Sequence, residues 1–135
     1  MAKPAVRFRV DFGRHEAVGP GKIALLEQIA LGGSLSEAAR TLGMSYRRAW
    51  QLLESVNSSF EQPAVVSARG GRGGGGATLT PFGRQLIHLY RGFDAEVQTL
   101  AGRRFGPLMR VVGRSRGRAP RPRGTAAPVV RLKDR

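Results

Sequence analysis

The sequence contains no cysteine, few aromatic residues and no long apolar run. Without cysteine there are no disulfides and no thiol nucleophile, and zinc is left with only histidine and carboxylate ligands. The two histidines, His15 and His88, are isolated, and Ser45 has no histidine base in a plausible frame. We therefore expect a protein that is not an enzyme and holds neither a metal nor a cofactor.

No stretch approaches the roughly 18 apolar residues that a membrane-spanning helix needs. The N-terminus does not resemble a signal peptide, because Arg7, Arg9 and Asp11 interrupt its apolar residues. The expectation is a soluble cytoplasmic protein with no membrane partner.

Acidic residues are scarce, and the formal net charge is +14. Residues 1–102 carry 12 Lys and Arg against 8 Asp and Glu, whereas residues 103–135 carry 11 against 1. This balance favours a polyanionic partner such as nucleic acid. The length allows one domain. We place it at residues 1–105 and expect the Arg/Pro/Gly-rich tail, residues 106–135, to be largely disordered.

Hydrophobic periodicity predicts the order of the elements. Alternating apolar residues predict a strand over residues 6–13, and helical spacing predicts a first helix that ends at Gly32-Gly33. Residues 65–69 and 77–79 are typical of two strands of a hairpin. Thr80-Pro81 is a strong helix start, which predicts a long last helix over about residues 81–103.

Between the first helix and the hairpin, two short helical patterns meet at a tight break. Ser34 and Glu37 fit a capping box at the start of the second helix. Gly43 suits a left-handed turn, Met44 is expected to point inward, and Ser45 is expected to cap a third helix over about residues 45–58. The predicted inner faces are Leu35, Ala38, Ala39 and Leu42 on one helix and Ala49, Leu52, Leu53, Val56 and Phe60 on the next. The pattern is that of a helix-turn-helix.

The exposed start of the third helix is polar and basic. In a helix-turn-helix, only the N-terminal part of the second helix enters the major groove. Arginine with guanine and glutamine with adenine are favoured bidentate pairs. The predicted DNA contacts are Ser45, Tyr46, Arg47, Arg48 and Gln51, with Ser34 and Ser36 added from the start of the preceding helix. The alternative is that both arginines are ordinary solvated surface.

Trp50 admits two interpretations. Aromatic side chains are mostly buried, so we expect it to pack against the first strand. Alternatively, its indole N–H reaches a phosphate at the edge of the groove.

A glycine-rich segment, Gly70 to Gly76, joins the two strands of the hairpin. It matches a GxGxxG pattern by composition alone, and a dinucleotide site requires that motif between a strand and a helix. We interpret residues 69–77 as a wing whose bare backbone approaches DNA while Arg69 and Arg72 supply positive charge. An inert flexible linker is the alternative.

The last helix carries an apolar stripe longer than a small domain can cover. Phe82 and Leu86 are expected to cover the domain itself. An exposed apolar surface of this length predicts a dimer interface. The residues assigned to it are Tyr90, Phe93, Val97 and Leu100. The alternative is that the whole stripe covers only its own domain.

Four segments together resemble one known family: Ile29 to Ser36, Met44 to Trp50, Gly70 to Thr80, and Leu86 to Tyr90. They are similar to the N-terminal DNA-binding domain of the molybdate-responsive ModE-type transcriptional regulators, a winged helix related to that of LysR-type regulators. The similarity covers about residues 18–100.

The resemblance implies a dimer formed through the long helix, a recognition helix at residues 45–58 and a wing at residues 69–77. In full-length members molybdate binds in C-terminal Mop-type domains. The arginine-rich tail does not resemble such a domain, so the resemblance implies DNA binding and leaves open whether this chain senses molybdate.

The predicted fold is mainly α with a small β-hairpin, a winged helix-turn-helix of order β-α-α-α-β-β-α. The predicted function is that of a sequence-specific DNA-binding transcriptional regulator, a homodimer on double-stranded DNA, linked to molybdenum homeostasis. A separate ligand-sensing partner is left open. Two alternatives remain: a nucleoid-type or RNA-binding basic protein with little sequence preference, and a carrier of molybdate or another ligand.

Overall fold

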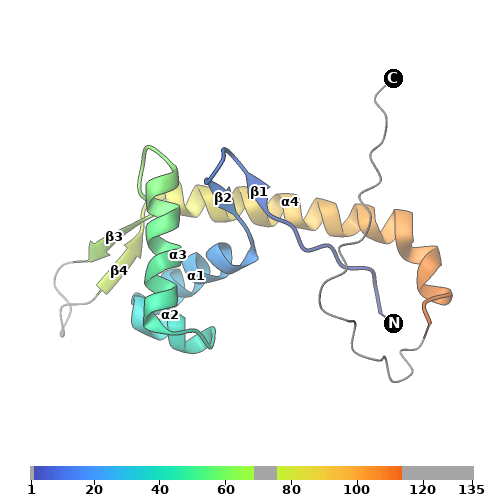
Figure 1. Cartoon of the computed structure of the whole chain (residues 1–135), viewed down its shortest axis with the longest axis horizontal. Helices are drawn as coiled ribbons and strands as arrows, with labels where there is room; N and C mark the ends of the chain where they lie inside the picture. The colour runs from blue at the N-terminus through green and yellow to red at the C-terminus, as the bar shows by residue number, and fades with distance from the viewer. Residues whose placement is uncertain (1, 69–75, 114–135) are drawn as a thin grey trace, which may run out of the picture.

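The computed structural model describes residues 2–68 and 76–113. The chain forms β1 (Val10–Asp11), β2 (Ala17–Val18), α1 (Pro20–Gly32), α2 (Leu35–Thr41), α3 (Tyr46–Ser59), β3 (Val65–Ala68), β4 (Gly76–Leu79), α4 (Pro81–Phe105) and the 3₁₀ helix η1 (Gly106–Arg110) (Figure 1). The two strand pairs, β1–β2 and β3–β4, are both antiparallel. This mainly helical arrangement is consistent with the predicted winged-helix-like fold.

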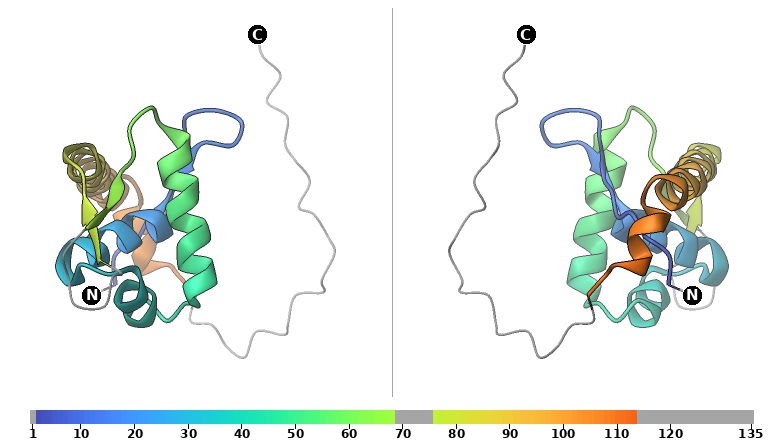
Figure 2. Two further views of the ribbon diagram at one scale, coloured as in Figure 1. Left: turned by 90° about the vertical axis from the view of Figure 1, so that its left-hand side faces the viewer. Right: turned by 90° about the vertical axis from the view of Figure 1, so that its right-hand side faces the viewer.

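Helix α1 is the centre of the core. Ile23, Leu25, Leu26 and Ile29 are all fully buried on it. It ends at Gly33, whose φ of 69° is a left-handed conformation that a residue with a Cβ rarely adopts. Helices α3 and α4 lie on opposite sides of α1 (Figure 2). The positions of α3 and α4 are therefore set by a shared apolar support.

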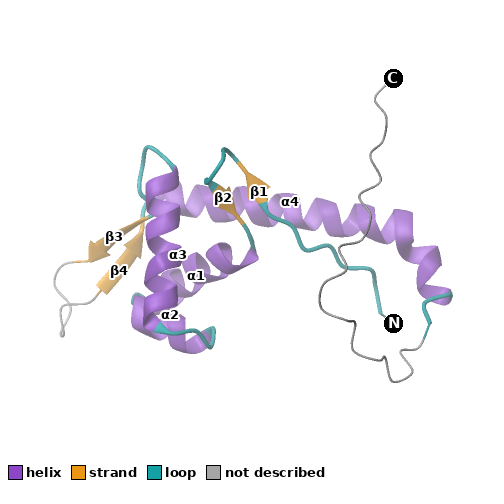
Figure 3. Cartoon of the chain, viewed as in Figure 1, coloured by secondary structure: helices purple, strands orange, loops and turns teal. Residues whose placement is uncertain are grey.

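The predicted first strand is much shorter in the structure. Only Val10–Asp11 pairs, with Val18 and Ala17 of β2, a two-residue strand that periodicity did not predict. Residues 2–9 form an extended arm that runs beside α4 (Figure 3). The observed element order therefore has an additional β2 before α1 and the additional helix η1 after α4.

Side chains of α4 hold this arm. The side-chain amide of Gln98 accepts from the backbone N–H of Val6 at 3.0 Å and donates to its carbonyl at 2.7 Å. Phe8 stacks on Tyr90 with ring centroids 5.0 Å apart, and the Tyr90 hydroxyl donates to the Phe8 carbonyl at 3.0 Å. Of the alternating residues, Val6 and Phe8 are held by helix α4 and not by a sheet, whereas Phe12 is 57% exposed.

The last helix extends beyond its predicted end. Helix α4 continues to Phe105, and η1 packs against it as far as Arg110. Disorder was predicted from residue 106 onward, so that boundary was placed too early. The rest of the predicted tail, residues 114–135, lies outside the described residues. Within the described part of the chain, no helix has the length and apolarity to cross a bilayer.

The start of α4 lies so close to the backbone of Ala64 that only glycine fits at position 83. Thr80 caps α4 by accepting from Gly83 N at 3.0 Å and donates to the Pro63 carbonyl at 2.7 Å. A Cβ at Gly83 would lie 2.3 Å from the carbonyl oxygen of Ala64. This contact fixes the angle between α4 and the segment that leads into β3.

We expect Gly83→Ala to lower the free energy of unfolding by about 1–3 kcal/mol, because α4 must move away from Ala64. Gly92→Ala is the matched control in the same helix, since a Cβ there meets no atom within 4 Å. It is expected to raise the free energy of unfolding by about 0.5–1 kcal/mol. Urea denaturation of the three proteins measures both changes, and equal stabilisation by the two substitutions would contradict the contact.

Candidate nucleic-acid interface

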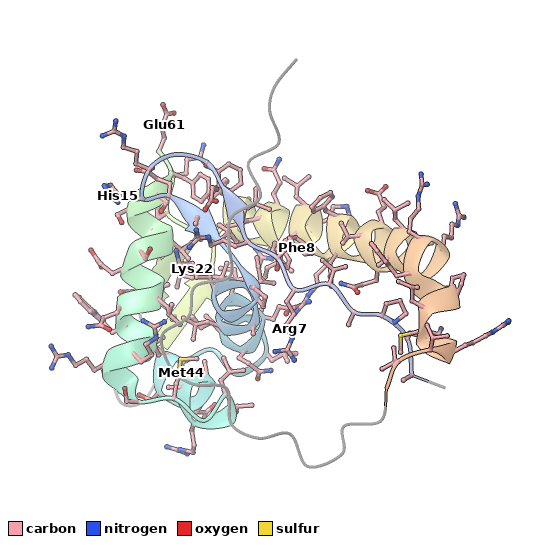
Figure 4. All side chains as sticks on the ribbon, turned by 45° about the vertical axis from the view of Figure 1, so that its right-hand side comes forward. Arg7, Phe8, His15, Lys22, Met44 and Glu61 are labelled. Carbon is pink, nitrogen blue, oxygen red and sulfur yellow. The ribbon has the colours of Figure 1, made fainter. Side chains whose placement is uncertain are left out.

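Helices α2 and α3 cross through small side chains. Ala38, Ala39 and Ala49 are at most 3% exposed, and they lie between the two helices and α1. Gly43, with φ of 67°, makes the turn between the helices, and Met44 packs against the core, as predicted (Figure 4). Two crossing helices joined by a tight turn are therefore present, as the helix-turn-helix prediction requires.

Helix α3 begins with the predicted cap and keeps its predicted apolar face. The Ser45 hydroxyl accepts from the backbone N–H of Arg48 at 3.0 Å. Ala49 and Val56 are buried, and three larger residues of the stripe, Leu52, Leu53 and Phe60, pack partly buried against the core. The apolar side of α3 is thereby turned toward α1 and α2, and its polar side toward solvent.

The predicted DNA contacts on α3 form one exposed surface, which we call the α3 surface: Ser45, Tyr46, Arg47, Arg48 and Gln51. All five residues are exposed. The prediction that this end of the helix is accessible is confirmed. Base contact by these residues is a separate prediction.

The two serines predicted to contact DNA from the start of α2 differ in exposure. Ser34 is half-buried, and its hydroxyl accepts from Glu37 N at 3.0 Å. The predicted return bond from the Glu37 side chain is not among the hydrogen bonds of the described residues. Ser36 is exposed. The Ser34 hydroxyl accepts a hydrogen bond at the cap but keeps its own proton. It can therefore still donate to a phosphate.

The prediction that Trp50 packs against the first strand is wrong. Its side chain is 50% exposed, and Tyr46, one turn earlier on the same side of α3, is 57% exposed. The reason is angular, because Trp50 stands about 100° around the helix from Ala49, at the edge of the buried stripe. Two aromatic side chains therefore lie on one side of α3 at the solvent boundary.

The β3–β4 hairpin is anchored beside α3. The side-chain Oδ1 of Asn57 accepts from Ala64 N at 2.9 Å and from Val65 N at 3.2 Å, and its Nδ2 donates to the backbone carbonyl of Val65 at 3.1 Å. On the other strand, Ala77 N donates to Gly33 O at 2.9 Å. Both strands are thus tied to the helix-turn-helix. Sequence reasoning missed Asn57, although a polar residue next to the buried Val56 was a signal.

The predicted wing tip cannot be located. Arg69, Arg72 and the glycines of residues 70–75 lie outside the described residues. Strands β3 and β4 pair from Val65 with Leu79 to Ala68 with Gly76, so the hairpin itself is confirmed up to that point.

The predicted dimer face is only partly exposed to solvent. Tyr90 is 6% exposed because Phe8 covers it, and burial raises the pKa of its hydroxyl, which stays protonated to donate. The assumption that Tyr90 needs a partner chain to bury it is wrong. Phe93 and Leu100 are 48% and 53% exposed, while Val97 is half-buried. Leu89, which the prediction omitted, is also exposed.

No three metal-ligating side chains come together within residues 2–68 and 76–113. Arg91 instead joins α1 to α4, through a bidentate pair with Glu27 and a weaker contact with Asp94. Hydrogen bonds to Glu27 hold the pKa of Arg91 above its usual value. These acidic residues therefore support the fold.

Known proteins match half of this chain or more. A "Molybdenum transport protein ModE" of Azotobacter vinelandii is 36% identical over 107 residues, which is 79% of this chain and 40% of that protein. The "DNA-binding transcriptional dual regulator ModE" of Escherichia coli is 48% identical over 71 residues, 53% of this chain and 27% of that protein. The chain is homologous to the ModE-type proteins.

The match covers only part of each of these relatives. A "Molybdenum-pterin-binding protein MopB" of Rhodobacter capsulatus is 43% identical over 83 residues, 62% of this chain and 31% of that protein. The chain thus spans less than half the length of these three relatives. No family model matches it. The predicted resemblance to ModE-type proteins is confirmed.

Trp50 is the only tryptophan, so its fluorescence reports directly on the α3 surface. We expect emission close to that of indole in water and ready quenching by iodide, because half of the side chain is exposed. Binding of duplex DNA is expected to protect it from iodide. A blue-shifted emission that iodide does not quench in the free protein would show that Trp50 is packed, contrary to the structure.

Proposed function

We propose that this chain is a DNA-binding transcriptional regulator of the ModE type, related to molybdenum homeostasis, and not an enzyme. The observation that carries the proposal is the α3 surface, a capped and exposed helix start with two arginines and a glutamine. Its relatives include proteins named as transcriptional regulators and as molybdenum-pterin-binding proteins.

In this proposal α3 is the recognition helix. Its first two turns enter the major groove, where Arg47 and Gln51 read base edges and Arg48 contacts the backbone. Because Trp50 is exposed beside Arg47, its indole N–H donates to a phosphate at the groove edge. The cap at Ser45 supports the assignment, since it gives α3 a defined start.

The β3–β4 hairpin is the wing of the proposed winged helix. Asn57 and Gly33 hold the base of its two strands beside α3, so the glycine-rich segment is directed from a fixed position. Arg69 and Arg72 then contact the phosphates or the minor groove. A glycine-rich backbone suits this role because it approaches the DNA closely.

A homodimer is the proposed binding species. Leu89, Phe93 and Leu100 remain exposed along α4 after the arm has covered Tyr90. Pairing two copies of α4 buries this stripe and presents two recognition helices to a two-fold symmetric site. The dimer residues of the proposal are therefore Phe93, Val97 and Leu100, with Leu89 added.

A second candidate is a nucleic-acid-binding protein with little sequence preference. The observation that favours it is the charge of residues 103–135, 11 Lys and Arg against 1 acidic residue. Such a protein would bind all duplexes similarly, with a steep salt dependence that reflects many phosphate contacts.

Arg47→Ala tests base reading. We expect it to weaken binding to a duplex that the wild-type chain selects from a randomised pool by about 1–3 kcal/mol, and to weaken binding to a shuffled duplex much less. Deleting residues 114–135, which removes eight Lys and Arg residues, is expected to weaken both duplexes about equally. Fluorescence anisotropy at fixed salt measures these affinities. Equal losses on both duplexes for Arg47→Ala would overturn base reading by α3.

A further inference from the structure

Helix α3 has a strand pair on each side. The β3–β4 hairpin lies on one side and the β1–β2 hairpin on the other (Figure 1). The tip of β1–β2 reaches the C-terminal end of α3, where Phe12 contacts Phe60 edge to face with centroids 5.3 Å apart. The proposed wing serves only one side of α3, and the β1–β2 side has no assigned role.

Lys22, on the first turn of α1, lies on that second side. Its ammonium group donates to the carbonyl of Ala17 in β2 at 2.6 Å, which holds the side chain in a defined place. Figure 4 shows Lys22 between the β1–β2 hairpin and α3.

Two further cations, Arg9 and Arg48, come from elements that border Lys22, the arm before β1 and the start of α3. Burial lowers the pKa of the Lys22 ammonium, and the positive charges of Arg9 and Arg48 lower it further. Arg9 comes from the arm beside Gly19, since a Cβ on Gly19 would lie 3.6 Å from that of Arg9. Arg48 comes from the first turn of α3. Three elements thus bring positive charge to one place.

An acidic side chain offsets one of these three charges. Arg9 pairs with Asp11 at 3.0 Å, with both side chains well exposed. Lys22 and Arg48 take part in no ion pair within the described residues. Bringing cations together without a counter-charge costs free energy, and a bound anion relieves that cost.

We propose that Lys22, Arg9 and Arg48 hold a phosphate of the DNA backbone, on the side of α3 opposite the β3–β4 hairpin. This inference rests on the proposed function. The backbone is the occupant we choose because Arg48 belongs to the α3 surface, and a helix in the major groove has a phosphate strand on each side. The β1–β2 hairpin thereby becomes a second backbone contact, across the groove from the wing.

The test is the salt dependence of binding by the full chain. For Lys22→Met, we expect the slope of log K against log salt to become shallower by about 1 on both the selected and the shuffled duplex, with about five-fold weaker binding at 0.15 M salt. Lys22→Arg keeps the charge and is expected to keep the wild-type slope. Arg104→Met removes one exposed charge near the far end of α4 and is expected to change the slope much less.

A wild-type slope for Lys22→Met, or the same slope change for Arg104→Met, would overturn the phosphate site. If Lys22→Met fails to fold by circular dichroism, Arg9→Met takes its place, because Arg9 is exposed and the same loss of slope is expected. Failure of the proposed function is distinct from this outcome. It would appear as a wild-type chain that selects no sequence, whatever the slope of the Lys22 variants.

Discussion

Helices α2 and α3 meet at Ala38, Ala39 and Ala49, three buried side chains small enough for the helix backbones to approach closely. Gly43, at φ of 67°, lets the chain turn between them. Larger side chains at this crossing would push α3 away from α1 and rotate its polar side. The exposure of Arg47, Arg48 and Gln51 therefore depends on the buried methyl groups of these three alanines. Every proposal about DNA contact rests on this crossing.

Much of the fold could be predicted because its determinants are local. The caps at Ser34, Ser45 and Thr80 each involve an N–H three residues later, and the turn at Gly43 depends on one backbone conformation. The arm could not be predicted in the same way. Phe8 covers Tyr90 from 82 residues away, and periodicity shows which face is apolar without showing what covers it. The same limit made the strand over residues 6–13 too long.

The candidate site shows where average tendencies mislead. Tryptophan is usually buried, yet Trp50 is exposed because the stripe of α3 is narrow and small residues already fill its centre. A count of charges says how many cations a segment holds and not where they lie. Residues 103–135 hold almost half of the cations, whereas Lys22, a single half-buried lysine, lies beside the recognition helix of the proposal. A spacing pattern carries no information on Lys22, since its significance comes only from the packing of β2, α1 and α3.

The central claim is that two copies of α3 read a specific duplex. Hydroxyl-radical footprinting of the full chain on genomic fragments, with and without molybdate, tests it most directly. The account predicts protection at discrete sites with two-fold symmetry, in half-sites about one helical turn apart or a multiple of it. Comparison with molybdate shows in addition whether a ligand alters the footprint. Uniform protection along all fragments, or discrete sites without symmetry, would contradict the account.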